Sequence, residues 1–247
     1  MKSGESAARN WSPFLSMVGM TTAAGATPED IARFHGFYDE VHVKEVLAAN
    51  PGFGVPLRYE LDHEPDPVTP RWLALYPIEE ERQVDGYLER QRDPGLNART
   101  YTAGPEVWSS ASFVWRVLWR RVTASAPLAG PVTGLLVAGV DPPSDATDTE
   151  LAEFTDFYDT GHIPDILQHG GYRSYARYER VADLPSAFGD YPRFCSLYTT
   201  DVPRDEADPE SALAKAGRAG LLSRGPEVWQ RRTTRWRLWF TPLSSAG

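Results

Sequence analysis

The chain has 247 residues, a formal charge of −9 at pH 7 and one cysteine, Cys195. A chain of this length suits one large domain or two small ones, and folding buries roughly 70% of its unfolded surface. The acidic balance argues against a nucleic-acid partner, which favours a basic face. A single cysteine cannot form an internal disulfide, so the sequence does not require an oxidising compartment.

Neither the apolar runs nor the N-terminus points to a membrane. No run approaches the length of a membrane span, and the polar stretch 1–10 lacks the apolar segment of a signal peptide. We therefore expect a cytoplasmic protein with no membrane partner.

The first half of the chain predicts the element order β-α-β-β-α-β. A strand is expected at 14–20. Thr27 followed by Pro28 is typical of a helix start, because the threonine can cap and the proline suits the first turn. This helix should end at Pro51. The other elements expected here are strands at 53–61, 72–76 and 113–122 and a second helix at 79–92.

The strand expected at 113–122 alternates, and one of its faces is heavily aromatic. Aromatic residues on several strands favour a pocket for a flat apolar ligand, although any single one can simply be core. The first face of this strand carries Phe113, Trp115, Val117 and Trp119, and the second carries Val114, Arg116, Leu118 and Arg120.

The second half repeats the first, which indicates a tandem duplication. The pentapeptide Gly-Pro-Glu-Val-Trp at 104–108 recurs unchanged at 225–229, and Arg-Tyr-Glu at 58–60 recurs at 177–179. We expect the halves to span 11–123 and 131–243. The repeated elements are strands at 132–140, 172–181, 194–200 and 233–240, a helix at 148–168 with Asp148 as candidate N-cap, and a helix at 206–222.

Each half carries a histidine motif on its first helix. In the second half it begins Tyr158-Asp159-x-x-His162 and continues with Pro164-Asp165, and Gly-Tyr and Arg-Tyr-Glu follow. With this motif the half-repeat resembles the dimeric α+β barrel superfamily, especially its EthD-like and antibiotic-biosynthesis monooxygenase-like branches. The resemblance covers nearly the whole chain. It implies an α+β fold in which two ferredoxin-like repeats form one intramolecular dimeric α+β barrel, which would also remove exposed sheet edges.

The second copy of the motif is the candidate catalytic site. Asp159 and His162 are three residues apart on a helix, so they should share a face. A carboxylate beside an imidazole prepares a general base. Pro164 should make the helix kink or restart near His162, which would lift the imidazole towards a cleft, whereas the first copy has Lys44 at that position. We therefore predict His162 as the acid/base and Asp159 as its orienting residue.

The expected substrate-binding residues surround the two motifs. Arg58 and Arg177 could hold an anionic or carbonyl group, or could pair with the glutamates two residues on, Glu60 and Glu179. The Gly-Pro-Glu-Val-Trp tryptophans could anchor a turn instead of lining a cleft, and the histidine motif could be a cap or a surface ion pair. His35, His63 and His169 are expected to be solvated. The substrate-binding set is Tyr158, Tyr178, Arg177, Trp229, His42 and Asp39.

No cofactor site is recognisable. The chain has no phosphate-cradling glycine loop, no Cys/His cluster with metal-ligand spacing and no Gly-x-Ser-x-Gly turn. The peroxidase branch would imply His162 as a haem ligand, but the Asp and Arg pattern that accompanies it is not recognisable. We therefore expect no cofactor.

Three functions remain open. The first is a secondary-metabolism enzyme in which His162 moves a proton during cyclisation, isomerisation or dehydration of a hydrophobic aromatic or polyketide-like molecule. The second, implied by the monooxygenase-like resemblance, is reaction of the deprotonated substrate with dioxygen or with reduced flavin supplied from elsewhere. The third is a non-catalytic barrel that binds a small molecule. Both a monomer and a homodimer are compatible with the sequence.

Overall fold

The computed structural model describes residues 11–93, 95, 100–126, 128, 130–203 and 208–243. Their contacts define two compact units. The first-half unit comprises Ser12–Arg120, Arg180–Tyr191 and the chain from Pro242, and the second-half unit comprises chiefly Arg121–Glu179 and Pro192–Thr241. The segment Arg180–Tyr191 therefore belongs to the first-half unit, although it lies within the range 131–243 expected for the second half.

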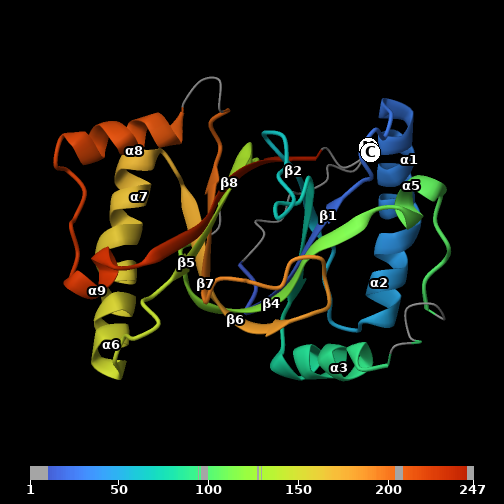
Figure 1. Ribbon diagram of the computed structural model, residues 1–247, viewed down its shortest axis with the longest axis horizontal. Coiled ribbons are helices and arrows are strands. Elements are labelled where there is room, and N and C mark those ends of the chain that lie inside the picture. The colour runs from blue at the N-terminus through green and yellow to red at the C-terminus, as the bar shows by residue number, and fades with distance from the viewer. Residues whose placement is uncertain are drawn as a thin grey trace. The chain divides into compact units, whose positions relative to one another are not determined.

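The first-half unit has the order β-α-β-β-α-β, with a helical interruption and a short extra helix (Figure 1). Its antiparallel sheet has the strand order β4-β1-β3-β2. The elements are β1 (Phe14–Thr21), α1 (Pro28–Phe37), η1 (Tyr38–His42), α2 (Val43–Ala49), β2 (Leu57–Leu61), β3 (Trp72–Ile78), α3 (Glu81–Gln91), α5 (Glu106–Ser109) and β4 (Ser112–Ala124).

The second-half unit follows the same order, with the sheet β8-β5-β7-β6. The tandem duplication itself stays an interpretation of the sequence. The elements are β5 (Gly134–Asp141), α6 (Asp148–Phe157), η2 (Tyr158–His162), α7 (Ile163–Gly170), β6 (Ser174–Asp183), β7 (Phe194–Thr200), α8 (Pro209–Arg218), α9 (Glu227–Gln230) and β8 (Thr233–Pro242).

The start expected for α8 falls at 206, and residues 204–207 lie outside the described part of the chain. Across the described ranges, no helix combines the length and the apolar character that a membrane crossing requires.

In each unit the first helical run, α1-η1-α2 or α6-η2-α7, begins after a threonine that forms a capping box. The Thr27 hydroxyl accepts from the Asp30 N–H, and the Asp30 carboxylate accepts from the Thr27 N–H in return. Thr147 and Glu150 form the same pair before α6. The expected N-cap is thus confirmed for Thr27 and wrong for Asp148. The N-cap of α6 is Thr147, because the capping box needs an acidic residue three positions later and Glu150 stands there.

Each long helix is interrupted by a π-turn, η1 or η2. The N–H of Val43 bonds the carbonyl of Tyr38, and the N–H of Ile163 bonds that of Tyr158, both five residues back. Such a turn holds one residue more than an α-turn. The first copy forms it without a proline, so Pro164 is not its cause. The expected restart of the helix near His162 is confirmed, because α7 begins at Ile163 directly after η2, with Pro164 in its first turn.

A β-bulge near the start of β4 moves the side chain of Phe113 to the opposite face of the sheet. The register between β1 and β4 shifts between Gly19 and Met20, and Val114 is the extra residue. A bulge reverses the alternation of side chains beyond it. Phe113 therefore lies on the face of Arg116, and its expected place on the tryptophan-rich face is wrong. The pairing of β5 with β8 shifts in the same way.

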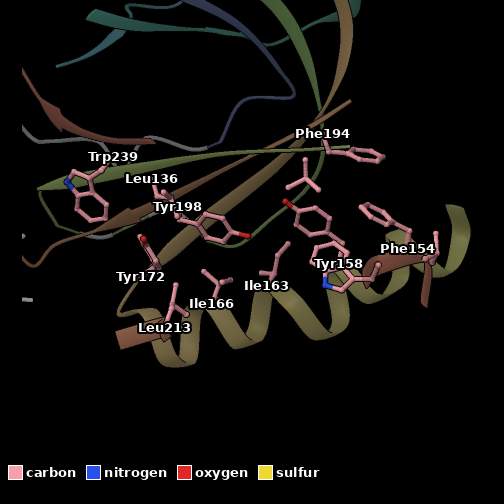
Figure 2. Close-up of a cluster of buried hydrophobic side chains, with 13 residues drawn as sticks. Leu136, Phe154, Tyr158, Ile163, Ile166, Tyr172, Phe194, Tyr198, Leu213 and Trp239 are labelled. Atoms are coloured by element: carbon pink, nitrogen blue, oxygen red, sulfur yellow. The ribbon is translucent and has the colours of Figure 1, made fainter. Parts of the chain in front are cut away.

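An apolar core joins helices to sheet in each unit. In the second-half unit, side chains from the sheet and from the helix carrying Ile163 and Ile166 meet in one layer (Figure 2). In the first-half unit the matching core includes Phe34, Tyr38, Val46, Trp72 and Tyr76.

Candidate functional site

A cavity of about 220 Å³ lies within the first-half unit, where η1 and α2 face β1, β3 and β4. We call it the first-half cavity. An apolar protein cavity of about 150 Å³ already binds benzene, so this volume suits one or two aromatic rings. The residues that shape its chemistry are Tyr38, His42, Tyr76, Tyr101, Trp108 and Arg116.

His42 presents its imidazole to this cavity. The ring centre lies 4.6 Å from that of Trp108 and 5.3 Å from those of Tyr38 and Tyr101. Nδ1 is buried and has no hydrogen-bond partner among the described residues. Burial among aromatic rings disfavours the cation and lowers the pKa of His42 to about 4. At neutral pH the ring is therefore uncharged and able to accept a proton.

Two phenols supply a hydrogen-bond donor to the same cavity. The hydroxyls of Tyr38 and Tyr76 are 2.8 Å apart, and either can donate to the other. Burial raises the pKa of Tyr38 to about 12 and holds the pKa of Tyr76 well above its usual value. Both phenols therefore stay protonated, and the bond between them uses only one of their two protons.

A charged network supports Tyr38. Arg58 donates from Nη1 to Asp39 Oδ1 at 2.7 Å and from Nη2 to His35 Nδ1 at 2.6 Å. Because arginine only donates, His35 carries its proton on Nε2. The guanidinium lies 4.1 Å from the centre of the Tyr38 ring. The expected solvation of His35 is wrong, since Arg58 and the edge contact with Trp72 hold its ring.

Arg116 gives the cavity wall a positive charge. Its Nη2 donates to Gln91 Oε1 at 3.0 Å and to the Tyr87 hydroxyl at 3.4 Å, and its Nη1 donates to the Pro185 carbonyl at 3.3 Å. Its backbone N–H donates to the Tyr191 hydroxyl at 2.9 Å. The chain segment that carries Pro185 and Tyr191 therefore positions this residue.

The corresponding region of the second-half unit is filled by larger side chains. Ser16 pairs with Tyr76 and Leu118, whereas the matching position holds Leu136, which pairs with Tyr198 and Trp239. Figure 2 shows Leu136, Tyr198 and Trp239 within one packed cluster, and Leu136 and Trp239 are buried. Leucine and tryptophan thus occupy positions where the first half has serine and leucine.

Asp159 and His162 do not form the predicted pair. Asp159 Oδ2 accepts from Arg177 Nη2 at 2.8 Å, and its Oδ1 is buried without a partner in the described structure. The His162 ring instead lies 5.4 Å from that of Tyr158 and 4.7 Å from that of Trp229. In a π-turn residues four apart meet and residues three apart diverge, so Asp159 does not orient His162. The acid/base role of His162 stays a prediction.

The other predicted residues of the second half are core. Arg177 is fully buried between the rings of Tyr158 and Phe194, and the Tyr158 hydroxyl bonds the Ser196 hydroxyl at 2.9 Å. Tyr178 is also buried and alternates to the opposite face of β6. Trp229 packs in the cluster of Figure 2. The expected pairing of the two arginines with the neighbouring glutamates is wrong, because Glu60 and Glu179 pair with Arg71 and Arg193.

The packing around His162 does not fit a haem. The rings of Tyr158 and Trp229 cover the imidazole that would have to bind the iron. Within the described ranges, no three His, Cys, Asp or Glu side chains form a group able to hold a metal ion.

Sequence reasoning missed most of the polar residues that line the cavity, among them Asn50, Tyr101 and Arg116. Asn50 is buried and accepts from Arg90 at 3.0 Å, and Tyr101 contacts His42. Neither belongs to a motif. Arg116 was visible only as a position that recurs as Arg237.

The chain resembles solved structures although no family model and no curated protein matches it. Chlorite dismutase from Candidatus Nitrospira defluvii, in complex with imidazole, has a TM-score of 0.54 at 9% identity over 94% of this chain and 91% of that one. A mutant of that enzyme in complex with cyanide has a TM-score of 0.54 at 11% identity, over 94% and 90%. An anthrone oxidase-like protein, at 15% identity over 94% and 92%, has a TM-score of 0.49, which is too low to carry an argument.

The chain shares its fold with these chlorite dismutases. At such low identity the likeness shows the fold alone. The chemistry of this chain therefore rests on the residues of its own first-half cavity.

Proposed function

We propose that this protein is an enzyme that moves a proton on a small aromatic molecule held in the first-half cavity. The observation that supports it most is the His42 imidazole on the wall of a cavity of about 220 Å³, which is uncharged and partly buried and whose buried Nδ1 has no partner among the described residues. A buried polar atom without a partner calls for an explanation, and a substrate proton is one.

The aromatic walls would hold the ring of the substrate. Trp108 and Phe53 line the cavity, and Trp108 also lies against His42. A flat ligand stacked on Trp108 therefore places its substituents near the imidazole. Positioning of this kind supplies much of the rate enhancement in proton transfer, because the reacting atoms are already close.

The proton would move between the substrate and His42. The imidazole takes a proton from a phenol, or from a carbon next to a carbonyl, and becomes imidazolium. The electron pair left behind resides on the substrate oxygen, which accepts a hydrogen bond from the spare proton of the Tyr38–Tyr76 pair. Return of the proton to another carbon completes an isomerisation or cyclisation, and its delivery to a departing hydroxyl completes a dehydration.

A comparison of small-molecule extracts tests this function. The native host carries either the wild-type protein or His42→Asn, and we expect one compound to accumulate in the variant while another disappears. Equal masses would indicate isomerisation or cyclisation, loss of water would indicate dehydration, and one added oxygen would indicate reaction with dioxygen. Identical extracts would refute the proposal and favour a non-catalytic binding protein.

A further inference from the structure

We propose that the ligand of the first-half cavity is a small aromatic anion, in which one or two rings bear a carboxylate or an ionised hydroxyl that binds the Arg116 guanidinium. The proposal builds on the proposed function, since it takes the same cavity as the active site. It concerns binding, however, and can be tested without turnover.

The charge of Arg116 is not neutralised by the protein. All its side-chain hydrogen bonds go to neutral acceptors, namely Gln91 Oε1, the Tyr87 hydroxyl and the Pro185 carbonyl. Among the described residues it has no carboxylate partner within ion-pair distance. A guanidinium has more N–H groups than these three bonds use, so donors remain for a ligand.

The matching arginine of the second half lacks this property. Arg116 pairs with Val18 in the sheet and Arg237 pairs with Ala138, at corresponding positions of the two registers. Arg237 forms an ion pair with Glu210 at 3.3 Å. Arg58, near the cavity, is likewise paired with Asp39. Within the described part of the chain, Arg116 is therefore a cation without an ion-pair partner, and the net charge of the chain is −9.

The surroundings of Arg116 suit an aromatic anion. Its guanidinium carbon lies 5.4 Å from the centre of the Phe113 ring, which also lines the cavity. Phe113 reaches this face only because of the bulge in β4. A planar carboxylate on a ring matches the planar fork of a guanidinium, and a partly enclosed site strengthens their attraction relative to water. A neutral ligand of the same shape lacks this charge attraction to the guanidinium.

Titration calorimetry with matched probes tests the proposal. The probes are benzoate and 2-naphthoate, each compared with its neutral amide, and the proteins are wild type, Arg116→Gln, Arg116→Lys and the control Arg237→Gln. We expect the wild type to bind at least one carboxylate about tenfold or more tightly than its amide, since a hydrogen bond to a charged group contributes that much. Arg116→Gln should abolish the preference, Arg116→Lys should keep part of it, and Arg237→Gln should leave it unchanged.

Equal binding of carboxylate and amide by the wild type would overturn the proposal, as would a preference that survives Arg116→Gln or binding of neither probe. The comparison of probes on the wild type decides the matter even if Arg116→Gln fails to fold. His42→Asn separates this inference from the proposed function. If that variant binds the carboxylate normally and host extracts do not change, the anion site stands and the proton-transfer role falls.

Discussion

His42 and His162 have the same neighbours in sequence but different surroundings in space. The proline after His162 made the second copy the better match to the superfamily motif. The structure instead places the open volume beside His42, because serine stands at 16 where leucine stands at 136. Which half has the cavity therefore depends on Ser16 and Leu136, which lie more than 20 residues from His42 and His162 and belong to no local motif.

The first prediction concerns the charge of His42. Its pKa lies at about 4 because burial disfavours the imidazolium. The Cε1–H signal of His42 in a proton–carbon NMR spectrum, assigned by its absence in His42→Asn, should therefore keep its neutral-ring shift as the pH falls from 8 to about 5. A midpoint near 6.5, the ordinary histidine value, would show that the ring is solvated and would contradict the account.

At the scale of elements, strand and helix periods predicted the type of the main elements, and the capping pattern placed the start of the first helix at Thr27. The π-turns as such were not predictable, because η1 forms one with neither a glycine nor a proline in it. The bulge was not predicted either, since a register shift depends on the partner strand. The π-turns and the bulge nevertheless determine which side chains meet at the candidate sites. The π-turn separates Asp159 from His162, and the bulge brings Phe113 to the face of Arg116.

The second prediction concerns a substitution that gives the first half the leucine found at the matching position of the second half. Ser16→Leu should fill the first-half cavity as Leu136 fills its counterpart, so the aromatic probes should no longer bind, while the free energy of unfolding should change by less than about 1.5 kcal/mol. Calorimetry and urea unfolding measure the two effects. Probe binding that survives Ser16→Leu would mean that the ligand lies elsewhere.

Its counterpart, Leu136→Ala, should behave in the opposite way. Leu136 is buried in the cluster of Figure 2, and removal of a buried leucine side chain costs about 2–5 kcal/mol because a cavity remains. Probe binding to the first-half cavity should not change. A loss below about 1 kcal/mol would indicate that the second-half cluster is less tightly packed than described.

At the level of the whole chain, the segment Arg180–Tyr191, which comprises the end of β6 and the loop after it, belongs to the first-half unit and contributes to its site. Besides Tyr191, the N–H groups of Leu184 and Ala187 donate to the carbonyls of Arg116 and Phe113. The third prediction follows from this. Tyr191→Phe leaves the Arg116 N–H without its acceptor, so it should lower the free energy of unfolding by about 1–3 kcal/mol and weaken carboxylate binding several-fold. Unchanged stability and affinity would show that the loop has no part in the site.

The fourth prediction is a loss of stability in mild acid. Burial lowers the pKa of His35, His42 and His162 to about 4 in the folded protein, whereas an unfolded histidine has a pKa near 6.5. Between these values the unfolded chain binds protons that the folded chain does not. Stability therefore falls as the pH falls, by up to about 1.4 kcal/mol per pH unit for each histidine.

Urea unfolding at pH 7, 6 and 5 measures this effect. His42→Asn and His162→Asn should each reduce the slope, because each removes one of the protons that unfolding takes up. A free energy of unfolding that stays constant from pH 7 to 5 would contradict the burial of these rings.

If the first-half cavity is the working site of the protein, His42 and not His162 is needed for its product. The comparison of host extracts made with His42→Asn and with His162→Asn tests this, since the two substitutions are chemically identical and both imidazoles are partly buried. The account predicts that His42→Asn abolishes the product while His162→Asn leaves it at the wild-type level, provided that both variants fold. Loss of product in His162→Asn alone would return the site to the second half and contradict the account.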